Sequence, residues 1–64
     1  MKKFYVTLAR ELQGYCIIAY APSEMALRLH LIANYGKLWC SVYTEIPSER
    51  IIGVPLYVGD EGED

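Results

Sequence analysis

One helical segment with extended segments on both sides is the feature that most constrains the fold of this chain. Pro22 and Glu24 are typical of a first helical turn, because proline lacks the N–H that would be unpaired there and glutamate complements the helix dipole. The N-cap is Ala21 or Ser23, and the pattern does not decide between them. Gly36 supplies a left-handed stop, so we expect the helix to end just before it.

Two extended segments precede this helix and two follow it. Residues 4–9 alternate apolar and polar side chains, and residues 15–20 are apolar on both sides, which favours a central strand. The short connection between them predicts an antiparallel hairpin. Residues 38–45 alternate cleanly, and residues 51–58 form a fourth extended piece. Pro55 cannot donate to a strand ladder, so the fourth piece is an edge strand or is interrupted.

The order β-β-α-β-β predicts an α+β fold, with a small antiparallel sheet of three to four strands and one helix on one face. A chain of 64 residues, 53% of them apolar, has room for one domain, predicted over residues 1–58. So short a chain buries only about 60% of its unfolded surface, which favours self-association.

Residues 59–64 carry four carboxylates and are predicted to be a disordered acidic tail that aids solubility or binds a basic groove.

Two leucines disturb the amphipathic pattern of the helix. Five apolar residues fall within about 120° on a helical wheel and are predicted to pack on the sheet. They are Met25, Ala26, Leu29, Ile32 and Ala33. Leu27 and Leu31 fall on the far side. They are ordinary surface leucines, a contact stripe for a second copy or another protein, with a dimer favoured, or residues packed under the chain's own termini.

The face of the sheet opposite the helix is where we expect a binding function. Strand alternation places Tyr5, Trp39 and Tyr43 together on that face, and we predict them to be the partner-binding residues. The pairing of the second strand is not fixed by the sequence, so either of its faces can join them. Aromatic side chains with a polar end are typical of protein interfaces, and also of sheets that stack unpaired bases.

Charge separates these two interpretations. A platform for nucleic acid needs lysine and arginine among its aromatic rings to neutralise phosphates. The strand face with Trp39 and Tyr43 has no cation, and Glu45 on the same face would repel phosphate. The sequence therefore favours a protein partner over single-stranded nucleic acid. A third alternative is an accessory subunit of a larger assembly, whose exposed apolar surface is an obligate interface.

The chain offers little to support catalysis or metal binding. It has a single histidine, His30, which we expect to form local hydrogen bonds at the border of the packed helix face. No Cys-x-x-Cys, glycine-rich phosphate loop or serine elbow is present, so we predict no enzyme activity, no cofactor and no metal. Cys16 and Cys40 are predicted to be reduced, buried thiols. The absence of an export signal or a membrane-length apolar run favours a cytoplasmic location.

In size and layout the chain resembles small proteins of bacteriophages and other mobile elements, among them anti-CRISPR and other host-defence inhibitors. The shared features are the start Met1-Lys2-Lys3, a compact sheet with one helix, an acidic end and no catalytic motif. The resemblance implies a stoichiometric inhibitor that covers a surface of a host protein in the bacterial cytoplasm.

Overall fold

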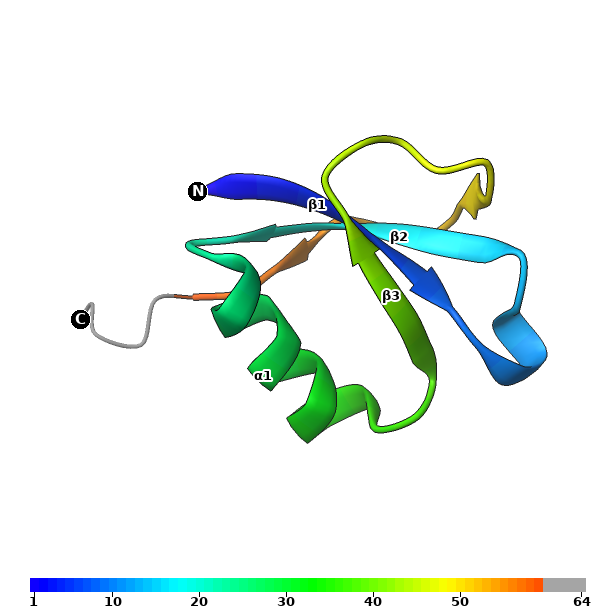
Figure 1. The fold of residues 1–64 in the computed structure, drawn as a ribbon, viewed down its shortest axis with the longest axis horizontal. Helices are drawn as coiled ribbons and strands as arrows, with labels where there is room; N and C mark the ends of the chain where they lie inside the picture. Colours follow the sequence, from blue (N-terminus) through cyan, green and yellow to red (C-terminus); the bar gives the residue numbers. More distant parts are fainter. Residues whose placement is uncertain (60–64) are drawn as a thin grey trace.

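The computed structural model describes residues 1–59, which form one helix against one face of a mixed β-sheet (Figure 1). The elements are β1 (Lys2–Leu8), the 3-10 helix η1 (Arg10–Leu12), β2 (Tyr15–Ala21), α1 (Glu24–Tyr35), β3 (Trp39–Tyr43), β4 (Arg50–Ile51) and β5 (Leu56–Tyr57). The predicted α+β class and the order β-β-α-β-β are confirmed, with the last extended piece split in two. The predicted tail over residues 59–64 lies outside the described residues, apart from Gly59.

The sheet has the strand order β3-β1-β2-β4, and β5 also pairs with β2. The β1–β2 hairpin and the β1–β3 pair are antiparallel, but β4 and β5 run parallel to β2. The prediction of a wholly antiparallel sheet is therefore wrong. The parallel pairing follows from the loop over residues 44–49, which crosses the sheet face and returns the chain to the start of β2 (Figure 1). The next strand, β4, therefore runs in the same direction as β2.

The predicted interruption of the fourth extended piece is confirmed. Gly53 has a φ of +73°, a left-handed conformation that L side chains rarely adopt, and Pro55 has no N–H to donate. These two residues separate β4 from β5, and each of the two strands is only two residues long.

The ends of α1 follow the local sequence signals. Ser23, one of the two predicted N-caps, accepts a hydrogen bond at its hydroxyl from the Ala26 N–H at 3.2 Å. Gly36 has a φ of +59°, and its N–H donates to the Leu31 carbonyl at 3.1 Å. No helix within residues 1–59 is long and apolar enough to cross a membrane.

The predicted rotation of α1 about its axis is wrong. Leu27 and Leu31 are 0% exposed, whereas Met25 and Leu29, both predicted to pack on the sheet, are 67% and 59% exposed. The helix packs through a narrow stripe of residues four apart, in which half-buried Tyr35 follows the two leucines. The two leucines belong to a core of seven buried residues, the others being Phe4, Val6, Ala19, Ala21 and Val58.

Candidate protein-binding surfaces

The sheet face opposite α1 carries a row of half-buried and exposed side chains at its centre. Tyr5 of β1 pairs with Tyr43 of β3 on one side and with Ile18 of β2 on the other. Residues that are directly paired across strands point to the same face, so these three side chains lie beside one another. The register therefore confirms that Tyr5 and Tyr43 share a face. It also shows that the face of β2 that joins them is the one with Ile18, which the sequence alone does not decide.

A second row lies next to the first. Lys3 pairs with Tyr20, which in turn pairs with Tyr57 of β5. The rings of Tyr20 and Tyr57 are stacked, with centroids 5.1 Å apart and an angle of 13° between their planes. We call the two rows together the tyrosine face. Its members are Lys3, Tyr5, Ile18, Tyr20, Tyr43 and Tyr57.

A cation joins the two rows of the tyrosine face. The Lys3 ammonium lies 5.4 Å from the centre of the Tyr5 ring, within the range of a cation–π contact. The neighbouring Tyr5 hydroxyl is the main cause that raises the pKa of Lys3, and Tyr20 is a further cause. Tyr43 and Tyr57 remain 48% and 67% exposed, so a large aromatic area faces solvent.

The rest of this sheet face is covered by the chain itself. The loop over residues 44–49 crosses it (Figure 1). Thr7 and Cys16, which are paired on this face, are both buried. The Cys16 thiol donates to the Glu49 carbonyl at 3.8 Å, and burial raises the pKa of this thiol, with Glu49 as a second cause. The loop therefore confines the exposed part of the face to the tyrosine face.

A bulge changes the alternation of β3. Thr7 pairs with Ser41, but the next residue of β1, Leu8, pairs with Trp39, so that Cys40 has no partner in the register. The Thr7 hydroxyl accepts a hydrogen bond from the Ser41 N–H at 3.1 Å, which ties the two strands together at the irregularity.

Because of this bulge, Trp39 does not belong to the tyrosine face. It is paired with core residue Leu8 and packs against the buried core on the α1 side, with the Arg28 guanidinium 5.8 Å from its ring centre. The prediction that Trp39 shares a face with Tyr5 and Tyr43 is therefore wrong. Cys40 is exposed rather than buried, and both cysteines are free thiols.

Sequence reasoning placed only Tyr5 and Tyr43 of the six members of the tyrosine face. The pairing of β2, which puts Ile18 and Tyr20 on this face, is not fixed by the sequence, and the positions of Lys3 and Tyr57 follow from their pairing with Tyr20. One signal was present: Ala19 and Ala21 alternate with the missed residues, and both are fully buried in the core with the helix leucines. Small side chains at alternate positions indicate the face on which another element packs closely.

A second candidate surface is the outward side of α1, which we call the outer helix face. It consists of the five residues predicted to pack on the sheet: Met25, Ala26, Leu29, Ile32 and Ala33. Met25, Leu29 and Ile32 are each 59–67% exposed. Leu27 and Leu31, the predicted self-association residues, are 0% exposed and cannot contact a second chain.

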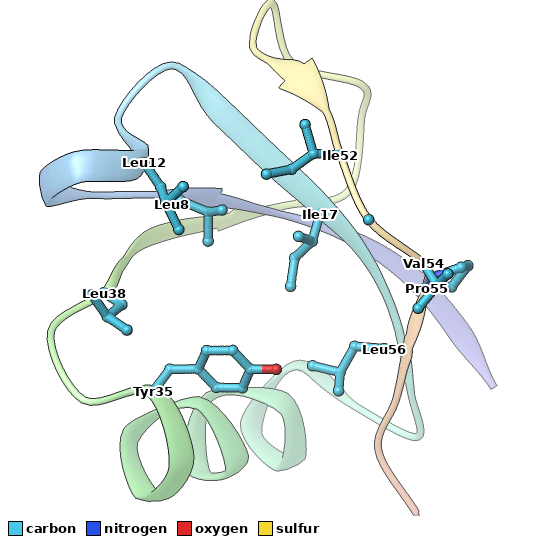
Figure 2. A pocket seen from close by; sticks show the side chains of 10 residues that line it. Leu8, Leu12, Ile17, Tyr35, Leu38, Ile52, Val54, Pro55 and Leu56 are labelled. Atoms are coloured by element: carbon cyan, nitrogen blue, oxygen red, sulfur yellow. The ribbon is translucent and has the colours of Figure 1, made fainter.

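An apolar pocket of about 320 Å³ lies on the α1 side of the sheet. Leu8, Ile17 and Leu56 line its sheet side, and the Tyr35 side chain crosses it with the hydroxyl directed toward Leu56 (Figure 2). The pocket is open because α1 covers only part of this sheet face, and Val54 on its rim is exposed. Its lining suits an apolar side chain or the apolar part of a small molecule.

His30 makes the local contacts that the sequence predicts. The Asn34 side-chain amide donates to the His30 carbonyl at 3.0 Å, and its nitrogen lies 3.4 Å from the imidazole Nδ1. Within residues 1–59, no group of three or more histidine, cysteine or acidic side chains is arranged to hold a metal ion.

Comparisons with protein families, with curated proteins and with solved structures found no match for this chain.

Proposed function

We propose that this chain is a non-enzymatic protein-binding module that acts by covering a surface of its partner with the tyrosine face. The observation that carries the proposal is the set of four tyrosines placed in two adjacent rows on one half of a sheet face. Tyrosine buries a large area at low conformational cost and tolerates water before binding, which is why it is enriched at interfaces. The role implied by the resemblance, a phage-type inhibitor of a host protein, is the form of this function that we propose.

The rigidity of the face supports this role. Its residues lie on paired strands rather than on loops, and the stacked rings of Tyr20 and Tyr57 already restrict each other. A preformed face loses less side-chain entropy on binding than a flexible one. Such a face can block a partner's surface without any chemistry at the contact.

The test compares tyrosines on opposite faces of the sheet. Tyr43→Ser with Tyr57→Ser removes the two most exposed rings of the face, and Tyr15→Ser is the matched control, because Tyr15 is 37% exposed and lies on the α1 side. Tagged chains are incubated with a bacterial lysate treated with nuclease, and captured proteins are quantified by mass spectrometry. We expect a protein that the parent and the control capture equally, with recovery at least about tenfold lower for the double variant.

Two outcomes would overturn the proposal. One is a captured set that the double variant retains in full, and the other is capture that disappears with nuclease treatment, which would indicate a nucleic-acid ligand. Circular dichroism of each variant checks that the fold is intact before capture is compared.

A further inference from the structure

The tyrosine face carries a cation that the described part of the chain does not neutralise. Lys3 is the only charged residue among the six members of this face, and it is exposed. Within residues 1–59, the one ion pair joins Arg28 to Glu24 on α1, so Lys3 has no carboxylate partner in that part of the chain. A protein that covers the tyrosine face therefore meets an ammonium group without a counter-ion.

The position of this ammonium makes it part of the contact surface. A lysine at the edge of an interface can extend its charged end into solvent. The Lys3 ammonium instead lies 5.4 Å from the centre of the Tyr5 ring, over the row that Tyr5 forms with Ile18 and Tyr43. The Tyr5 hydroxyl also raises the pKa of Lys3, which keeps the group charged at neutral pH. A partner that covers Tyr5 therefore covers the charge as well.

Covering the charge sets a requirement on the partner. Removing an ammonium group from water is costly unless an opposite charge and hydrogen bonds replace its hydration. The Tyr5 ring offers a cation–π contact, but the ammonium of Lys3 has three N–H donors, and one ring cannot satisfy all of them. A carboxylate of the partner would supply both the opposite charge and the acceptor oxygens.

A carboxylate of the chain itself lies at the other end of this sheet face. Glu49 accepts a hydrogen bond from the Cys16 thiol at its carbonyl and contributes to the raised pKa of that thiol. Cys16 pairs with Thr7, and Thr7 is separated from Lys3 by about 13 Å of strand. Lys2, next to Lys3, is a second exposed cation. The face is therefore positive at the end with Lys3, which favours an acidic group of the partner at that end.

We infer that the tyrosine face recognises an acidic protein surface, on which a carboxylate binds Lys3 while apolar side chains contact the tyrosine rings. The inference rests on the proposed function, because it describes the partner of the same face. A carboxylate is favoured over the phosphates of a nucleic acid, since a polyanion is held by several cations and the tyrosine face has one.

The first experiment uses three small molecules that share an apolar body and differ in charge. The full chain is titrated with 4-phenylbutyrate, 4-phenylbutyramide or 4-phenylbutylamine, and backbone amide shifts are followed by NMR. We expect 4-phenylbutyrate to shift the amides of Lys3, Tyr5 and Tyr20 with a millimolar dissociation constant, at least about threefold lower than those of the other two. Lys3→Met should abolish this preference. Lys37→Met, which removes an exposed lysine beyond the end of α1, should retain it.

Three results of this titration would overturn the inference. They are equal binding of the three molecules, no binding of 4-phenylbutyrate up to about 20 mM, and shifts confined to Leu8, Ile17 and Leu56 in the apolar pocket. A full-length variant with the four carboxylates of residues 60–64 changed to amides tests the chain's own end as the source of the carboxylate. We expect the same preference in this variant and the parent. A preference that appears only in the variant would assign Lys3 to the chain's own end and overturn the inference.

A second experiment uses the protein captured in the test of the proposed function. Lys3→Met, Lys3→Glu and the control Lys37→Met are compared with the parent in capture from the nuclease-treated lysate. We expect recovery at least about tenfold lower for Lys3→Glu, a smaller loss for Lys3→Met and no loss for the control. If Tyr43→Ser with Tyr57→Ser loses capture while both Lys3 variants retain it, the proposed function stands and the inference is wrong. Loss of capture after phosphatase treatment of the lysate would also overturn the inference, because the anion would then be a phosphate.

Discussion

At the scale of single residues, Trp39 shows how one irregularity changes the role of a side chain. Strict alternation along residues 38–45 predicts that Trp39 points away from the helix, yet the bulge opposite Leu8 turns it toward the core. A bulge adds one residue to a strand without leaving a reliable mark in its sequence. The candidate site was therefore predictable for Tyr5 and Tyr43, whose pairing lies in the regular part of the ladder, and not for Trp39, which lies beyond the bulge.

This placement predicts different costs for two aromatic truncations on β3. Trp39→Ala should lower the free energy of unfolding by about 2 kcal/mol, less than a fully buried tryptophan would, because the ring is only partly buried. Tyr43→Ala should cost less than about 1 kcal/mol, since Tyr43 is 48% exposed. Urea denaturation of both variants measures the difference, and equal costs would contradict the assignment of Trp39 to the core.

At the scale of elements, the sequence determines where each segment starts and ends better than how it is oriented. The hairpin, the helix boundaries at Ser23 and Gly36, and the break at Gly53 follow from backbone chemistry within a few residues. The rotation of α1 and the direction of β4 and β5 depend on contacts between distant segments. Since α1 is apolar on two sides, periodicity alone favours the wider side, which is the exposed one.

The orientation of α1 predicts that truncating Leu27 costs more stability than truncating Met25, the opposite of what the helical wheel predicts. Leu27→Ala should lower the free energy of unfolding by about 3 kcal/mol, because the side chain is 0% exposed and its loss leaves a cavity. Met25→Ala should change it by less than about 0.5 kcal/mol, because Met25 is 67% exposed. Urea denaturation at low micromolar protein gives both values. A larger cost for Met25→Ala would mean that the helix packs through its other side.

At the scale of the whole molecule, charge is separated along the chain. The net charge is −2, and the four carboxylates over residues 60–64 contribute −4, which leaves +2 for residues 1–59. Lys3 lies within the tyrosine face, so aromatic rings and a cation do occur together there. The attraction of the full chain for a polyanion therefore depends on two opposing charges. One is the net charge of +2 on residues 1–59, which include Lys3, and the other is the charge of −4 on residues 60–64.

This balance predicts no useful affinity of the full chain for nucleic acid. Fluorescence anisotropy with a labelled single-stranded oligonucleotide should show no binding of the full chain below about 100 µM at 150 mM salt, because neutralising phosphates requires several cations. A chain ending at residue 59 should bind weakly at about 20 mM salt and lose that binding as salt rises, the behaviour of a non-specific electrostatic contact. Micromolar binding by the full chain, weakened by Tyr57→Ser, would instead assign the tyrosine face to base stacking and contradict the protein-binding proposal.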